Sequence, residues 1–350
     1  MKILYQIPSL TTIYAGRTIY NGYKNAFLDL GHEFRPYTAD DDFVEVMDEY
    51  KPDILITGLS NYSLKYLDLD LLSKYRKKGL KVLVNVSFWS SPMSKLRINE
   101  TSGLKDNKAF VDIIKSGRLG DAYFNSCEQF DERMIGFEKG TGFPYHTIPL
   151  AADKTIIKEN FDKRFVADIS YIGTNLPEKS QFFKEFVFPL GKKYNLKLYG
   201  QDWTLLDQAL GWAQRFGQYF NIHWLANIRK PKLQLNDEAK IYSSSVVSIN
   251  VHEDYQKKFG GDCNERTFKI PLAGGFEVTD DVACIRKYFE ADKEMIIAKD
   301  KEEWLEKIEY YIKHPEEREA LIKAGQARVL KDHTYHNRAI QLLEIIDKTK

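Results

Sequence analysis

The sequence predicts an α/β protein built from two doubly wound parallel sheets, and three observations lead to this. Short runs of β-branched and apolar residues alternate with amphipathic segments along most of the chain, which is the pattern of βαβ units. The alternation starts twice, at residues 2–7 and again at residues 166–173. The chain has 350 residues, more than one ordinary domain of ~100–200 residues. We therefore expect two Rossmann-like domains, residues 1–155 and 156–335, and a C-terminal helical segment, residues 336–350.

In the first half, apolar runs predict a series of parallel strands. They cover residues 2–7, 32–37, 53–57, 81–86, 122–126 and 145–149. Periodic apolar residues between the strands predict helices at residues 18–30 and 67–78, and the acidic run at residues 40–42 is typical of a helix cap. Residues 93–120 are polar and poorly periodic, so we expect part of this stretch to be a mobile loop.

The second half repeats this order of elements. Strands are expected at residues 166–173, 196–199 and 246–251, and helices at residues 180–193, 235–243, 304–312, 316–331 and 337–346. Residues 204–236 are unusual, because they combine tryptophans with several basic residues. Residues 252–263 form a polar loop after a buried strand. Residues 264–280 then indicate a short helix, a glycine turn and a strand.

The bulk composition limits the functional classes. The formal net charge is +1, so no global field would attract nucleic acid or an acidic membrane. The cysteines, Cys127, Cys263 and Cys284, lie far apart without the spacing of a zinc site, and we interpret them as reduced thiols of a cytoplasmic protein. Pro8 interrupts the N-terminal apolar run, so we expect no signal peptide. No run approaches the ~18 apolar residues of a membrane span.

The segment from Asn264 to Asp280 organises the predicted site. It follows a long loop at the carboxyl end of a core strand, which is where open α/β sheets bind ligands. Arg266 opens the short helix, and its planar guanidinium suits a phosphate. Gly274 and Gly275 follow the helix and permit a close backbone approach. The segment therefore predicts a site for an anion such as a diphosphate.

This segment also carries a family resemblance. Arg266-Thr267-Phe268 and the sequence PLAGGF at residues 271–276 resemble the donor-binding half of GT-B glycosyltransferases, the group often described as glycosyltransferase family 1 or CgeB-like spore-maturation proteins. Further matching motifs are YF at 288–289, KE at 293–294, HPEER at 314–318, AGQ at 324–326 and HTY at 333–335. The resemblance is specific from about Ser243 to the C-terminus.

The resemblance implies a GT-B fold, in which two Rossmann-like domains face each other across a cleft and the last helix crosses back to the first domain. It implies a glycosyltransferase, a hexosyltransferase by expectation, that moves a sugar from a nucleotide-diphosphate sugar to an acceptor hydroxyl. A UDP-sugar is the expected donor, and the acceptor is a glycan, a protein or a small molecule. The residues do not determine whether the anomeric configuration is retained or inverted, and the resemblance favours retention. The sequence requires no cofactor or metal, because cationic side chains can neutralise the leaving diphosphate.

Several residues are candidates for contact with the donor. They are Gly173, Thr174, Lys179, Asp202, Trp203, His252, Arg266, Lys269, Gly274 and Gly275. Several of them have a structural alternative. Gly173-Thr174 can be an ordinary turn, Lys179 a solvated helix residue and Trp203 a core side chain.

The catalytic residues are not determined, and His252 and Glu265 are the candidates. Family members commonly have a glutamate three residues after the arginine, where this chain has Lys269, and a further glutamate where it has Gly261. An ammonium group cannot accept a hydrogen bond from a ribose hydroxyl. This departure motivates an alternative function, a non-catalytic protein that binds nucleotides or glycans on a GT-B body.

In the first domain, the loop after the first strand is the candidate acceptor side. Thr12, Gly16 and Arg17 represent it, and Arg17 suits an acidic ligand. A third interpretation is a glycosyltransferase that acts on modified nucleic acid bases, because residues 204–236 mix aromatic and basic side chains that together can grip single strands or flipped bases.

Overall fold

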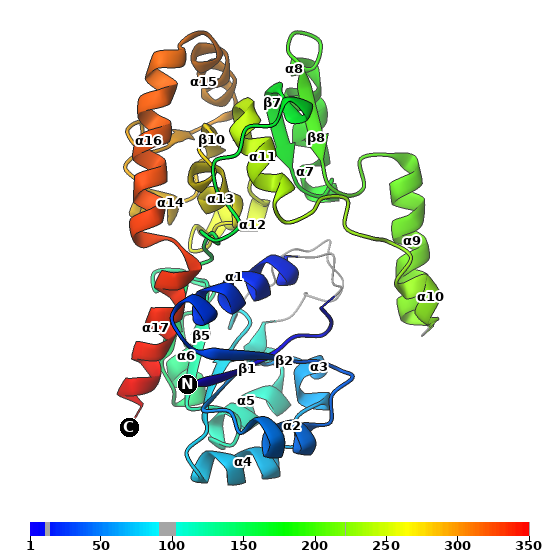
Figure 1. Ribbon diagram of the computed structural model, residues 1–350, viewed down its shortest axis with the longest axis vertical. Coiled ribbons are helices and arrows are strands. Elements are labelled where there is room, and N and C mark those ends of the chain that lie inside the picture. Colours follow the sequence, from blue (N-terminus) through cyan, green and yellow to red (C-terminus); the bar gives the residue numbers. More distant parts are fainter. Residues whose placement is uncertain (11–14, 91–102, 221, 350) are drawn as a thin grey trace. The chain divides into compact units, whose positions relative to one another are not determined.

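The computed structural model describes residues 1–10, 15–90, 103–220 and 222–349 (Figure 1). The chain divides into two compact units. The first contains residues 1–153, 259–262 and 334–350, and the second contains residues 154–258 and 263–333. The predicted Thr12 lies outside the described residues.

The first unit is built on a parallel sheet. Among the described residues its strand order is β2-β1-β3-β4-β5-β6. The strands are β1 (Lys2–Gln6), β2 (Glu33–Tyr37), β3 (Ile54–Gly58), β4 (Lys81–Asn85), β5 (Ala122–Asn125) and β6 (Tyr145–Thr147). The helices are α1 (Gly16–Asp29), α2 (Phe43–Tyr50), α3 (Asn61–Lys65), α4 (Leu69–Lys77), η2 (Leu104–Asp106), α5 (Lys108–Lys115), α6 (Phe137–Thr141) and α17 (Tyr335–Lys348).

Both faces of this sheet are buried, as expected for parallel strands that alternate with helices. Leu4 and Leu55 belong to one apolar core, whereas Ile3 and Ile54 belong to the other. Alternate residues of a strand point to opposite faces, so the almost continuous apolar runs in the sequence are a direct consequence of two buried faces.

The second unit also contains a parallel sheet, with the order β11-β10-β9-β7-β8. The strands are β7 (Ala167–Ile172), β8 (Leu196–Tyr199), β9 (Ser245–Asn250), β10 (Glu277–Asp280) and β11 (Ile296–Ala298). The helical segments are η3 (Lys163–Phe165), α7 (Pro177–Phe182), η4 (Phe183–Val187), α8 (Phe188–Leu190), α9 (Leu205–Tyr219), α10 (His223–Ala226), α11 (Asp237–Ser244), α12 (Asp254–Phe259), α13 (Arg266–Leu272), α14 (Ile285–Tyr288), α15 (Lys301–Lys313) and α16 (Pro315–Asp332).

The order of strands in the second sheet places a topological switch point between β7 and β9. The chain goes from β7 outward to β8, and then returns to form β9 on the other side of β7. The carboxyl ends of the two strands around such a point are where open α/β sheets bind ligands. This feature of the fold positions the candidate site.

The last helix of the chain, α17, completes the core of the first unit. Thr334 caps it through a capping box with Asn337, and the backbone N–H of Tyr335 donates to the carbonyl oxygen of Ala152. The Tyr335 ring lies on Gly22 of α1, where a β-carbon would come within 2.1 Å of it. Only glycine leaves room for this contact between the two helices.

The structure adds elements that the sequence analysis did not predict. Within the stretch 93–120, part of which was expected to be a mobile loop, the described residues 103–120 contain η2 and the amphipathic helix α5. Helices α9 and α10 lie in the segment that was noted only for its composition. The polar loop expected at residues 252–263 contains the short helix α12. Strand β11 was missed, because a run of three apolar residues is too short for a periodicity argument. None of the described helices is both long and apolar enough to cross a membrane.

Candidate functional site

Two cations meet at the carboxyl ends of β7 and β9. The Arg266 guanidinium donates to the carbonyl oxygens of Val251 (3.1 Å) and Ile172 (3.3 Å), which directly follow β9 and end β7 respectively. The ammonium group of Lys179, on α7, donates to the same Val251 oxygen at 2.7 Å. The two positive groups therefore share one acceptor at the switch point of the sheet.

Neither cation has a carboxylate within ion-pair distance among the described residues. Lys179 is buried, and its burial, together with the charge of Arg266, lowers the pKa of its ammonium group. Arg266 is partly exposed, and three of its five N–H donors are used by the protein. Two buried or half-buried positive groups without a counter-ion are suited to bind an anion.

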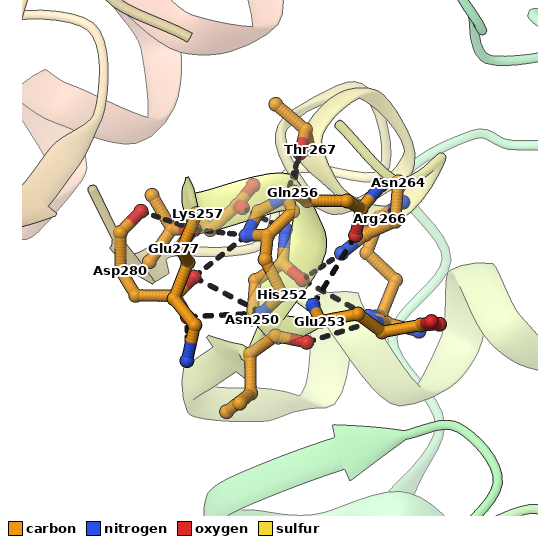
Figure 2. A network of polar contacts seen from close by, with 12 residues as sticks. Asn250, His252, Glu253, Gln256, Lys257, Asn264, Arg266, Thr267, Glu277 and Asp280 are labelled. Atoms are coloured by element: carbon orange, nitrogen blue, oxygen red, sulfur yellow. Dashed lines mark hydrogen bonds and ion pairs between the residues drawn. The ribbon is translucent and has the colours of Figure 1, made fainter. Parts of the chain in front are cut away.

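Asn250, the last residue of β9, fixes the orientation of Arg266 (Figure 2). The oxygen of its side-chain amide accepts from Nε of Arg266 at 3.0 Å and from the side-chain amide nitrogen of Asn264 at 2.9 Å. Its amide nitrogen donates to Thr267 at 3.1 Å and to Glu277 at 2.8 Å. All hydrogen-bonding groups of this buried side chain are occupied, so Asn250 acts as a rigid support for the guanidinium.

Glu277, at the start of β10, is buried, and one of its carboxyl oxygens accepts a hydrogen bond from the side-chain amide of Asn250. Its other oxygen has no hydrogen-bond partner among the described residues. Burial raises the pKa of this carboxyl to about 8, although the hydrogen bond from Asn250 and the charges of His252 and Arg266 oppose the shift. The raised pKa favours the neutral form of Glu277, so this carboxyl offers little negative charge to Arg266.

His252 lies beside this network and is held by Asp280, the last residue of β10 (Figure 2). Nδ1 of the ring lies 2.6 Å from Asp280, and the His252 backbone N–H donates to the same carboxylate. Nε2 lies 3.3 Å from the hydroxyl of Thr267. Burial alone would lower the pKa of His252, but Asp280 raises it. The ring is fully buried, and its contacts tie the end of β9 to β10 and α13; a role of His252 at the donor or in catalysis stays a prediction.

Comparisons with known proteins agree with this geometry. Residues 179–344 match the family described as glycosyl transferase-like. No curated protein matches the chain. Solved structures with similar folds include an α-glucosyltransferase in complex with UDP, at 14% identity and a TM-score of 0.64, covering 99% of this chain and 100% of that one.

Two further structures are similar over nearly the full length. The sucrose-phosphate synthase of Thermosynechococcus elongatus has 12% identity and a TM-score of 0.63, and a glycosyltransferase of Rickettsia africae has 12% identity and a TM-score of 0.60. Each alignment covers 99% of this chain and 98% of the other. These neighbours confirm the GT-B fold, and the family match covers most of the unit that holds the cations and the start of α17.

The chain has the GT-B fold, and residues 179–344 resemble the glycosyl transferase-like family. The assignment to the CgeB-like group stays a prediction.

Lys269, at the position where the family resemblance implies a glutamate, is part of an ion-pair triad. Its ammonium group lies 3.0 Å from Glu238 and 3.2 Å from Glu265, and all three side chains are largely buried. Burial opposes the charge of Lys269, but the two carboxylates raise its pKa. The triad neutralises Lys269, and it also binds the carboxylate of the catalytic candidate Glu265.

Gly274 and Gly275 lie at the opposite edge of the sheet from Arg266. They follow the C-terminal end of α13, whereas Arg266 begins this helix, and a helix of seven residues is about 10 Å long. Gly274 has φ = +73°, so the turn needs a glycine for its backbone conformation. Both residues form the turn into β10, at the end of α13 away from Arg266, and their contact with the donor stays a prediction.

The loops after β7 and β8 hold the remaining donor candidates. The indole N–H of Trp203 donates to the carbonyl oxygen of Gly173 at 2.9 Å, and its ring packs edge-on against Tyr171. Asp202 forms an ion pair with Arg229 at 2.8 Å. Trp203 and Asp202 are thus engaged within the protein. Gly173 and Thr174 follow β7 directly, beside the Ile172 carbonyl that Arg266 binds.

Gly16 and Arg17, the described acceptor-side candidates, begin α1 after β1; Gly16 is exposed and Arg17 is half-buried. They stand beside the switch point of the first sheet, between β1 and β3.

One cluster of possible metal ligands occurs in the part of the chain that the structure describes. Cys127, Asp131 and Asp262, all in the first unit, bring one ligand atom each within 4.8 Å of one another. The buried guanidinium of Arg133 bonds both carboxylates, with 2.6 Å to Asp131. The arginine supplies the positive charge that the carboxylates need, so this cluster is an internal ion pair and not a metal centre.

The sequence analysis missed Asn250, Glu277 and Asp280. Asn250 and Asp280 are the last residues of the neighbouring strands β9 and β10. A polar residue at the end of an apolar run was the available signal, and it would have identified both.

Proposed function

We propose that this protein is a glycosyltransferase that uses a nucleotide-diphosphate sugar, with UDP-sugars as the first class to test, and that Arg266 and Lys179 bind the diphosphate. The observation that carries this proposal is the pair of cations on the Val251 carbonyl oxygen without a carboxylate counter-ion. In the transfer, the bond between the anomeric carbon and the diphosphate oxygen breaks, and a bond from the acceptor hydroxyl oxygen forms. The electron pair leaves with the diphosphate, and the acceptor proton passes to a base.

The two cations would stabilise the negative charge that develops on the diphosphate as it leaves. They are already oriented by Asn250 and two backbone carbonyls, so little reorganisation is needed when charge appears. This arrangement supports transfer without a metal ion. Several structural neighbours are complexes with UDP or UDP-glucose, which favours a hexosyl donor.

The acceptor is proposed to be a hydroxyl of a glycan, protein or small molecule. One structural neighbour, an α-glucosyltransferase, is a complex with UDP and a DNA 13-mer. In this chain, two of the basic residues in segment 204–236 form ion pairs, Arg229 with Asp202 and Lys232 with Asp207. Their charges are therefore partly neutralised, which argues against a nucleic acid acceptor.

The test is a panel of UDP-, GDP-, ADP- and TDP-sugars, measured by thermal shift and by release of free nucleotide. We expect one nucleotide sugar to stabilise the wild type saturably, and we expect slow hydrolysis. Arg266→Ala should weaken binding by at least tenfold, because a charge-assisted contact to the diphosphate is lost. Arg286→Ala is the matched control, since this arginine in the same unit is exposed and paired with Asp281.

The outcomes separate the possible functions. Binding without nucleotide release, even with candidate acceptors, would favour the non-catalytic alternative. Unchanged affinity in the Arg266→Ala variant would mean that the diphosphate lies elsewhere. Because Arg266 also joins β7 to β9, the unliganded melting temperature of each variant is measured first.

A further inference from the structure

The α9–α10 hairpin, residues 205–226, carries its apolar side chains on the outside. Figure 1 shows it extending from the second unit, away from β7 and β8. Its large apolar residues that are more than half exposed are Leu205, Leu206, Trp212, Phe216, Tyr219, Phe220 and Trp224. Tyr219 is 80% exposed and Trp212 70%. Lone exposed apolar residues are ordinary, but a contiguous group of this size is not.

The inner face of the hairpin is small and polar instead. Gly217 allows α9 to approach α10 closely, because a β-carbon there would lie 2.5 Å from the backbone nitrogen of Ala226. The buried side-chain amide of Gln214 donates to the carbonyl oxygen of Ala226 at 3.0 Å. The hairpin is therefore held together by close backbone packing and hydrogen bonds. Its apolar residues contribute little to its own core.

The exposed residues form a continuous surface. Leu205, Trp212, Phe216 and Tyr219 are spaced by seven, four and three residues, which places them on one face of a helix. The Phe220 ring lies 4.5 Å from that of Phe216 and 4.8 Å from that of Tyr219. Aromatic side chains of about 200 Å² each, more than half exposed, give a surface of roughly 600 Å², at the upper end for a monomer.

The charged residues in and next to the hairpin indicate which kind of binding partner this surface suits. Residues 204–236 contain four basic residues and one acid, Asp207. Asp207 pairs with Lys232, and Arg229 pairs with Asp202 outside this segment. Arg215, stacked on Trp212 at 5.3 Å, and Lys230 have no carboxylate partner among the described residues. A nucleic acid needs many free cations for its phosphates, and it offers no partner for exposed leucines.

We propose that the α9–α10 hairpin docks this glycosyltransferase on the surface of a phospholipid bilayer that contains anionic lipids. Tryptophan and tyrosine rings prefer the membrane–water interface, and leucine and phenylalanine enter the adjoining acyl region. Arg215 and Lys230 meet the anionic headgroups. The apolar residues are spread over both helices, and a fluid bilayer can cover such a surface without a complementary shape. The contact is peripheral, and it does not depend on the donor site.

The test is co-sedimentation of the full chain with vesicles of phosphatidylcholine alone and of phosphatidylcholine with 30% phosphatidylglycerol. We expect the wild type to bind, more tightly to the anionic vesicles. The triple variant Trp212→Ala, Tyr219→Ala, Trp224→Ala should lose at least tenfold in partitioning. Arg215→Glu with Lys230→Glu should abolish the preference for anionic vesicles. The matched control is Phe130→Ala with Phe161→Ala, which removes two other exposed aromatic rings and should bind like the wild type.

Quenching of tryptophan fluorescence by brominated lipids provides a second measurement. It should affect the wild type and the control, but not the triple variant. Failure of the wild type to bind either vesicle overturns the proposal. So does a salt-dependent complex with an oligonucleotide, or a dimer that the triple variant abolishes, in the absence of vesicle binding. All the substituted side chains are exposed, so the variants should fold, and circular dichroism confirms this.

Discussion

Replacing Glu277 with glutamine should change how the stability of the second unit depends on pH. The Glu277 carboxyl is fully buried, and burial raises its pKa from 4.5 to about 8. Such a carboxyl binds its proton more tightly in the folded protein than in the unfolded chain. The resulting stabilisation is complete below pH 4.5 and is lost as the pH rises towards 8. Glutamine is uncharged throughout, and it keeps an oxygen that can accept from Asn250.

The magnitude follows from linkage. Each pH unit between the two pKa values costs the wild type about 1.4 kcal/mol of unfolding free energy from this group. From pH 5 to pH 8 the loss is roughly 3 to 4 kcal/mol. The Glu277→Gln variant escapes this loss. Its free energy of unfolding should therefore lie near that of the wild type at pH 5 and well above it at pH 8.

Urea unfolding followed by tryptophan fluorescence measures this difference. Four of the five tryptophans lie in the second unit, so the signal reports mainly on the unit that contains Glu277. The control is Glu319→Gln, an exposed substitution in the same unit. Its free energy of unfolding should depend on pH in the same way as that of the wild type. If the Glu277→Gln curve also runs parallel to the wild type from pH 5 to pH 8, Glu277 is ionised in the folded protein. The account of the uncompensated cations would then be wrong.

Two other substitutions test the supports of the site. Asn250→Ala should weaken nucleotide-sugar binding at least tenfold in calorimetry and destabilise the protein by about 2 kcal/mol, because Arg266 and Glu277 lose a buried hydrogen-bond partner. Unchanged affinity would show that Arg266 needs no such support. Lys269→Met should cost about 3 kcal/mol in urea unfolding, since Glu238 and Glu265 would be left as buried charges. The double variant with Glu238→Gln should recover part of this loss, and a double variant less stable than Lys269→Met would contradict the triad.

The parallel strands were predictable from the sequence because both faces of each sheet are buried. Burial on two faces produces continuous apolar runs, and these located the strands of the first unit and most strands of the second. Arg266 was predictable for a related reason, since a charged residue that opens a helix after a core strand must lie near the carboxyl edge of the sheet. The apolar hairpin was noticed only as an unusual composition, because no local pattern tells whether a tryptophan is covered.

The support of Arg266 was not predictable, because it depends on contacts between residues distant in sequence. Asn250 looks like the end of an apolar strand, and only the packing of α13 against β9 brings it to Arg266 and Thr267. The position of the glycines was not predictable for a different reason. Gly274 and Gly275 have the backbone freedom that a ligand site can use, but the direction of α13 puts them at the far edge of the sheet.

Lys269 illustrates how a local departure can leave a site electrostatically intact. Relative to the glutamate that the family resemblance implies at this position, the lysine adds two units of positive charge on the helix that Arg266 begins. An isolated buried ammonium group would be costly, so this helix could not simply accept the exchange. Glu238, on α11, and Glu265 provide the compensation, and they direct the Lys269 charge into the protein. Arg266 and Lys179 thus remain the cations without an ion pair at the carboxyl ends of β7 and β9, which is the property that diphosphate binding requires.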